Sequence, residues 1–129
     1  MNRKIVVAGA GGFIGGHLTK ALKEKGHHVR AVDIKPLNRW YQVSPDVDNV
    51  VLDLRIKENC YQALNGMNEV FNLAADMGGM GFIETHKAAC MLSVLINTHL
   101  LMAARDIGID RYFYASSACV YNGEKQTDP

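Results

Sequence analysis

The sequence has few cysteines and no pattern that would pair them. There are three in 129 residues, with no Cys-x-x-Cys pair and no zinc-ligand spacing. Disulfide frameworks and structural zinc sites depend on paired or regularly spaced cysteines. We therefore expect free thiols, no bound metal and a reducing compartment, with the cytoplasm as the default location.

Other signals are also missing. The net charge is +1 and there is no run of basic residues, which argues against a nucleic-acid partner. No apolar run reaches the length that spans a membrane, so no membrane partner is expected. With 48% hydrophobic and 21% charged residues, the chain can still bury the core of about one domain.

What the sequence does contain is a glycine-rich turn between an apolar strand and an amphipathic helix. Gly9 permits a tight turn, Gly12 lets a pyrophosphate approach the backbone, and Gly15 lets the helix pack closely on its strand. The free N–H groups at the start of the helix would face the phosphates. This context favours a dinucleotide site over the alternative, a purely structural turn.

The hydrophobic pattern alternates strands with helices along the whole chain. Strands are predicted at residues 4–8, 29–33, 49–54, 69–75 and 111–116, and helices at 13–25, 58–64 and 87–106. Residues 36–45 are predicted to form a loop. Such alternation indicates an α/β fold with a doubly wound parallel sheet, in which ligands bind at the carboxyl ends of the strands.

Two acidic residues end predicted strands. Asp33 lies about twenty residues past the glycines, where a carboxylate accepts hydrogen bonds from the adenosine ribose hydroxyls. Its charge would repel a 2′-phosphate, which favours NAD over NADP, although Lys35 and Arg39 could soften that repulsion. The alternative for Asp33 is a solvated acid in a loop. Asp53 could reach the adenine edge.

Several motifs follow one another in an order typical of one family. They are Gly9-x-x-Gly12-x-x-Gly15, Asp33, Asp53-Leu54, Asn72-Leu73-Ala74-Ala75 and the segment Ser116 to Tyr121. Over its whole length the chain resembles the amino-terminal half of an extended short-chain dehydrogenase/reductase in the NAD-dependent nucleotide-sugar epimerase/dehydratase family. The resemblance implies an NAD-binding Rossmann domain over residues 1–129. The cofactor-binding residues that it implies are Gly9, Gly12, Phe13, Ile14, Gly15, Asp33, Asp53, Leu54, Leu73, Ala74 and Ala75.

Two segments resemble the 3,5-epimerase branch of that family more specifically. Residues 74–83 read Ala-Ala-Asp-Met-Gly-Gly-Met-Gly-Phe-Ile, and residues 114–121 read Tyr-Ala-Ser-Ser-Ala-Cys-Val-Tyr. This implies a nucleotide-sugar substrate, with a GDP-hexose favoured, and epimerisation through a 4-keto intermediate whose C4 hydride is held on NAD. Ser117 and Cys119 would be catalytic: Ser117 would bind the C4 oxygen and Cys119 would act as acid or base. The implied substrate-binding residues are Gly78, Gly79, Ser117, Ala118 and Cys119.

Alternatives to these roles remain open. Cys119 could be a small buried hydrophobic residue, as is expected of Cys60 and Cys90. A 4-epimerase, a 4,6-dehydratase or a non-catalytic NAD-binding module would share most of the motifs.

The family's Tyr-x-x-x-Lys pair is missing. Tyr121 and Lys125 have this spacing, but Asn122-Gly123 between them disfavours a helix. Ser93 stands where the family has an asparagine in its long helix, with Asn97 one turn later. We therefore expect a truncated fragment, without the carboxy-terminal substrate domain, that is inactive alone. We also expect it to self-associate, as a homodimer or less specifically, through the apolar helix at 87–106.

Overall fold

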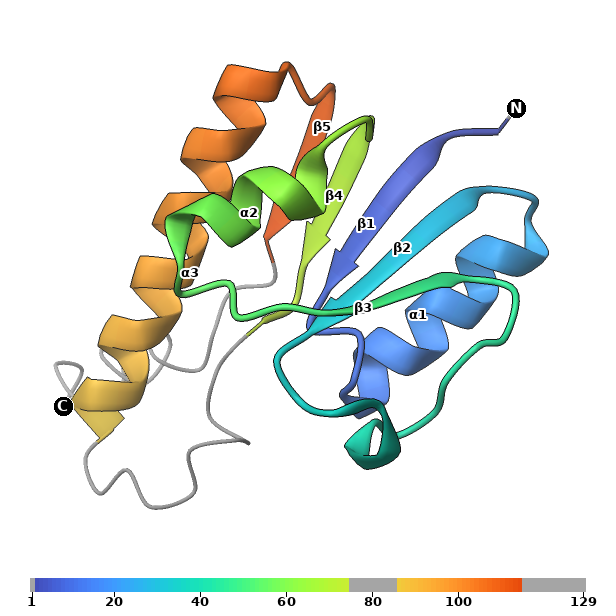
Figure 1. Ribbon diagram of the computed structural model, residues 1–129, viewed down its shortest axis with the longest axis horizontal. Helices are drawn as coiled ribbons and strands as arrows, with labels where there is room; N and C mark the ends of the chain where they lie inside the picture. Colours follow the sequence, from blue (N-terminus) through green and yellow to red (C-terminus); the bar gives the residue numbers. More distant parts are fainter. Residues whose placement is uncertain (1, 75–85, 115–129) are drawn as a thin grey trace, which may run out of the picture.

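A single parallel sheet forms the centre of the computed structural model, which describes residues 2–74 and 86–114, with side chains in the second range from residue 94. The strands are β1 (Lys4–Ala8), β2 (His28–Asp33), β3 (Asp48–Val51), β4 (Glu69–Asn72) and β5 (Arg111–Tyr114). They lie in the order β3-β2-β1-β4-β5, and every neighbouring pair is parallel (Figure 1). The predicted doubly wound α/β fold is confirmed.

The helices cover both faces of this sheet. They are α1 (Phe13–Glu24), α2 (Lys57–Leu64) and α3 (His86–Ile107), with a short 3-10 helix η1 (Leu37–Arg39). Alternate residues of β1 separate two cores: Val6 and Ala8 pack with α2 and α3, whereas Val7 packs on the α1 side. Because helices cover both faces, the strand from Ile5 to Ala8 is buried throughout.

The predicted elements all occur, with differences at their ends. The strands predicted at 49–54 and 69–75 are shorter, ending at Val51 and Asn72. In β4 the Asn72 side chain accepts a hydrogen bond from the Ala74 N–H, so that N–H is no longer available to a neighbouring strand. The loop predicted at 36–45 contains η1, which the sequence did not indicate. The helix-terminating glycines Gly26 and Gly108 have φ of 92° and 90°, as expected after a helix.

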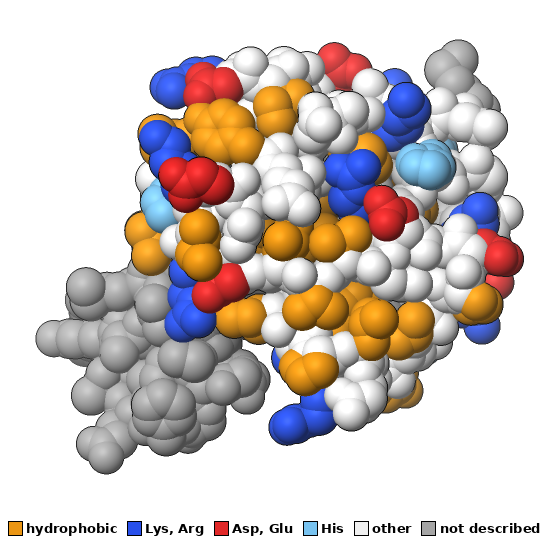
Figure 2. All heavy atoms as spheres, viewed as in Figure 1, with side chains coloured by type: hydrophobic (Ala, Val, Ile, Leu, Met, Phe, Trp, Pro, Cys, Tyr) orange, Lys and Arg blue, Asp and Glu red, His pale blue; other side chains and the backbone are white. Residues whose placement is uncertain are grey.

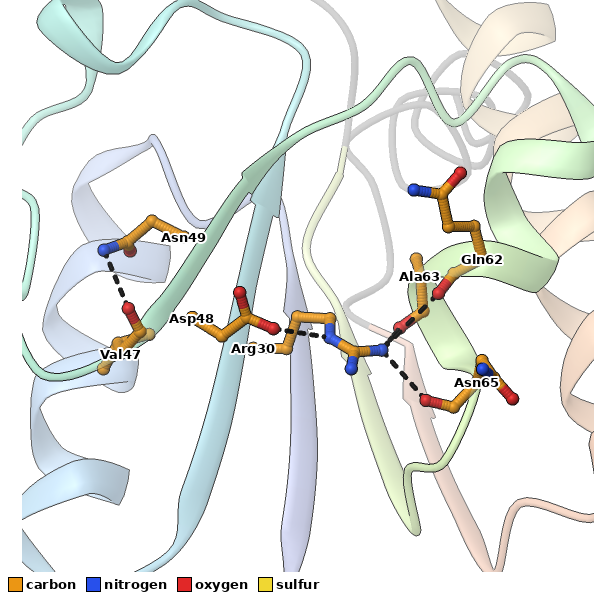
Figure 3. Close-up of polar contacts among 7 residues, drawn as sticks. All are labelled: Arg30, Val47, Asp48, Asn49, Gln62, Ala63 and Asn65. Carbon is orange, nitrogen blue, oxygen red and sulfur yellow. Dashed lines mark hydrogen bonds and ion pairs between the residues drawn. The ribbon is translucent and has the colours of Figure 1, made fainter.

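Arg30 joins β2, β3 and the end of α2 (Figure 3). Its Nε donates to the Asp48 carboxylate at 3.0 Å, and its Nη1 donates to the carbonyl oxygens of Ala63 at 2.7 Å and Asn65 at 3.0 Å. The last carbonyl groups of a helix lack partners within the helix and carry partial negative charge. A guanidinium therefore satisfies these carbonyl groups and fixes α2 over the sheet.

Cys60 is a core residue, as predicted. It is fully buried in α2, and its Sγ donates to the carbonyl of Leu54 at 3.2 Å. Burial raises the pKa of the thiol to about 12, which keeps it protonated and unreactive.

On the face shown in Figure 2, basic and acidic side chains are interspersed rather than segregated. Among the residues described, no helix is long and apolar enough to cross a bilayer. Within the same residues, no group of three histidine, cysteine or acidic side chains is placed to hold a metal ion.

Candidate functional site

The glycine turn after β1 lies between the ends of β2 and β4. The N–H groups of Gly9 and Ala10 donate to the Val32 carbonyl at 2.8 and 3.0 Å. Gly9 has a φ of 86°, and a Cβ there would lie 2.6 Å from the carbonyl carbon of Leu73. A side chain at position 9 is therefore excluded both by backbone conformation and by the backbone that follows β4.

Gly15 lets α1 approach this turn. A Cβ at position 15 would lie 2.2 Å from the Gly9 carbonyl oxygen and 2.8 Å from the Ala10 Cα. Both are backbone atoms, which cannot move away without displacing the turn. Gly15 therefore allows a close approach of α1, which is made to the turn after β1 rather than to the strand itself.

Gly12 is different, because nothing in the described fold requires a glycine there. Within the described residues, a Cβ at Gly12 would meet only the Gly9 carbonyl oxygen, at an ordinary 3.7 Å, and the φ of Gly12 is −87°. Gly12 is the N-cap of α1; no side chain caps the helix and the first turn carries no acid. The result is an open position beside N–H groups that need an acceptor, a geometry that suits a phosphate.

Asp33 lies at the carboxyl end of β2, next to this opening. It is 8% exposed; its Oδ2 accepts from the Gly11 N–H at 2.9 Å, and its Oδ1 accepts from the Lys35 N–H at 3.0 Å. A carboxylate has about four lone-pair positions, so each oxygen retains acceptor capacity. Asp33 can thus be held by the protein and still accept from a ribose hydroxyl.

Asp53 and Leu54 follow β3. The Arg55 guanidinium donates to both oxygens of Asp53 at 2.9 Å, and this bonding holds the pKa of that carboxyl below its usual value. The Leu54 side chain is buried in the α2–α3 core. If this pair contacts adenine, Leu54 must do so through its backbone; the predicted role of both residues stays a prediction.

At the end of β4 there is a polar cluster that the sequence analysis did not assign. The Asn72 Nδ2 donates to the Asn97 Oδ1 and the Tyr112 hydroxyl, both at 3.1 Å, and the Tyr112 hydroxyl donates to Asn97 at 2.7 Å. Burial raises the pKa of Tyr112, so its hydroxyl stays a donor. The cluster fixes the point where β4 leads into Leu73 and Ala74. The sequence signal that could have revealed this cluster was the polar Asn72 at the end of an apolar strand, together with Asn97 on the facing helix.

The described part of the site therefore brings together the glycine turn, Asp33 and the segment Leu73-Ala74. Phe13 and Ile14, at the start of α1, are exposed beside it. Ala75, Gly78, Gly79, Ser117, Ala118 and Cys119 lie outside the described residues.

Comparison with known proteins agrees with this arrangement. The model of the NAD dependent epimerase/dehydratase family matches residues 5–129, and the chain belongs to this family. NAD is the family's cofactor, and the open turn at Gly12 and the buried Asp33 fit it.

The sequence relatives indicate a branch of the family. The chain is 44% identical over 128 residues to the GDP-mannose 3,5-epimerase of Arabidopsis thaliana, covering 98% of this chain and 34% of that protein. It is 44% identical over 126 residues to GDP-mannose 3,5-epimerase 1 of Oryza sativa subsp. japonica, covering 97% and 33%. The chain thus spans about a third of the length of these relatives.

Solved structures share the fold. The UDP-glucose 4-epimerase of Thermus thermophilus, in complex with NAD, is 26% identical with a TM-score of 0.75, covering 88% of this chain and 37% of that one. MoeE5 in complex with UDP-glucuronic acid and NAD is 31% identical with a TM-score of 0.71, covering 88% and 36%.

The fold requires a glycine at position 15 but not at position 12, and measuring the stability of variants at the two positions tests this difference. Gly15→Ala should lower the free energy of unfolding by about 1–3 kcal/mol, because its Cβ would overlap backbone atoms. Gly12→Ala should change it by less than about 1 kcal/mol, because the position is open and loses only a modest N-cap preference. Urea unfolding of the two variants measures this, and equal losses would contradict the distinction.

Proposed function

We propose that this chain is the NAD-binding part of a nucleotide-sugar epimerase. The observation that carries the proposal is the open, uncapped start of α1 at Gly12 next to the buried Asp33 carboxylate. Family membership and the NAD complexes of its structural neighbours support it. When bound, NAD would supply the acceptor for the hydride of the sugar C4.

In this proposal each part of the chain has a distinct task. The first backbone N–H groups of α1, at Phe13 and Ile14, bind the pyrophosphate at Gly12. Asp33 accepts from the adenosine ribose, and Asp53 with the Leu54 backbone approaches the adenine. The backbone at Leu73, Ala74 and Ala75 lines the dinucleotide at the end of β4.

The proposed substrate is a GDP-hexose, epimerised through a 4-keto intermediate. The 44% identity to plant GDP-mannose 3,5-epimerases supports this choice. Ser117 would donate to the C4 oxygen and Cys119 would move a proton at the carbon next to the ketone, since an unperturbed thiol has a pKa of about 8.5, close to working pH. Gly78, Gly79 and Ala118 would contact the sugar. A UDP-sugar 4-epimerase is the alternative, given the similarity to the Thermus enzyme.

Cofactor selectivity tests the proposal directly. Calorimetric titration should give a lower Kd for NAD than for NADP, because the 2′-phosphate of NADP would meet the Asp33 carboxylate. Gly12→Val should abolish NAD binding without unfolding the chain, since its side chain would occupy the pyrophosphate position. Equal or tighter NADP binding would mean that Lys35 and Arg39 dominate and that the role given to Asp33 is wrong.

We propose that these 129 residues bind cofactor without turning over substrate. The only Tyr and Lys at the family's spacing are Tyr121 and Lys125, and Asn122-Gly123 between them disfavours the helix that the pair requires. With NAD and GDP-mannose in deuterated water, the chain should not exchange the C3 or C5 protons, as followed by NMR. Exchange faster than in a protein-free control would refute this.

The proposal also includes a cytoplasmic location and self-association of the chain. Helix α3 packs inward through Ile96 and Leu100, whereas Val94, Leu95 and Leu101 are 59%, 39% and 44% exposed. Exposed apolar side chains on one helix face favour pairing with a second copy. Sedimentation at micromolar concentration should show a dimer or larger species.

A paired variant provides the control for this measurement. The double substitution Val94→Glu and Leu101→Glu should shift the chain towards monomer, whereas Ile56→Glu, at a 47% exposed position outside α3, should not. A wild-type monomer would contradict self-association through α3.

A further inference from the structure

The chain's single tryptophan lies in a closed ring of hydrogen bonds around Asp33. The Trp40 Nε1 donates to the Lys35 carbonyl at 2.8 Å, and the Lys35 N–H donates to Asp33 Oδ1 at 3.0 Å. Gly11 donates to Asp33 Oδ2 at 2.9 Å, and the Tyr41 N–H donates to the Gly11 carbonyl at 2.8 Å. Because Trp40 and Tyr41 are adjacent in the sequence, the four hydrogen bonds form a closed ring.

Packing reinforces this ring. Trp40 is 7% exposed and belongs to the core on the α1 side, with Val7 and Ala31. A Cβ at Gly11 would lie 3.0 Å from the Trp40 Cδ1 and 2.9 Å from the Asp33 Oδ2. The indole and the carboxylate therefore both lie against Gly11.

We propose that Trp40 is a positioning residue for the adenosine ribose of the cofactor. It acts through residues 33–35: by holding the Lys35 carbonyl, it fixes the backbone whose N–H binds Asp33, and so it keeps the carboxylate in one orientation. This inference rests on the proposed function, because it assigns Trp40 a part in NAD affinity and in the discrimination against NADP.

The variant Trp40→Phe distinguishes this positioning role from a role in which Trp40 only fills the core. Phenylalanine retains an aromatic ring but cannot donate to the Lys35 carbonyl. A residue that only fills the core would affect stability and would change the affinity for NAD and NADP equally. A positioning residue changes the ratio of the two affinities, and its effect depends on Asp33.

The experiment is a double-mutant cycle on cofactor binding. Trp40→Phe should raise the Kd for NAD by about fivefold, the effect of losing one hydrogen bond, and should reduce the preference for NAD over NADP. In an Asp33→Asn background the same substitution should change the Kd for NAD less than about twofold. Tyr61→Phe is the control: it removes a hydroxyl that bonds Asp106 on the α2–α3 side, and should leave both affinities unchanged.

Amide hydrogen exchange of the ligand-free chain gives a second measurement. In Trp40→Phe the Gly11 and Lys35 N–H groups should exchange faster than in the wild type, while those of β4 keep their protection. Unchanged exchange, an unchanged affinity ratio, or an equal loss in the Asp33→Asn background would each overturn the positioning role. A wild-type chain that does not bind NAD would overturn the proposed function, and this role with it.

Discussion

The close approach of three backbone segments at Gly9 and Gly15 is the constraint on which the rest of the structure depends. At Gly9 the turn meets the backbone that follows β4, and at Gly15 the first turn of α1 meets Gly9 itself. Neither contact has room for a Cβ. These close contacts allow β1 to lie at the centre of the sheet, with neighbouring strands on both sides. They also allow α1 to begin over the carboxyl end of the sheet, where the strand order reverses.

The fold was largely predictable because its signals are local. The apolar strands, the glycines after helices and the alternation of elements each depend on a few neighbouring residues. Strand ends were less predictable: β4 ends where the Asn72 side chain binds the Ala74 N–H. That contact competes with the strand ladder, and the hydrophobic pattern, which continues through Leu73-Ala74-Ala75, does not reveal it.

The site was predictable in part, and what was missed depends on contacts between distant segments. The motif around Gly12 and the acid at position 33 follow from spacing along one βα unit. The ring through Trp40 requires a loop to fold back by five residues onto Lys35 and to bond Gly11 across the turn. The Asn72–Asn97–Tyr112 cluster joins three elements. Neither has a periodicity that could be read from the sequence.

The glycines at positions 9, 11, 12 and 15 separate what the fold needs from what a ligand needs. Positions 9, 11 and 15 are occupied on their Cβ side by the protein's own atoms, which explains a glycine at each without any ligand. Among the residues that the structure describes, Gly12 has no such neighbour; it has an ordinary φ and lies at an uncapped helix start. A larger residue there would fit the described fold, and a polar one could cap the helix. Under the proposed function, the glycine at position 12 leaves room for a phosphate at the N-terminus of α1, and the nearby Asp33 carboxylate would accept from the ribose joined to that phosphate.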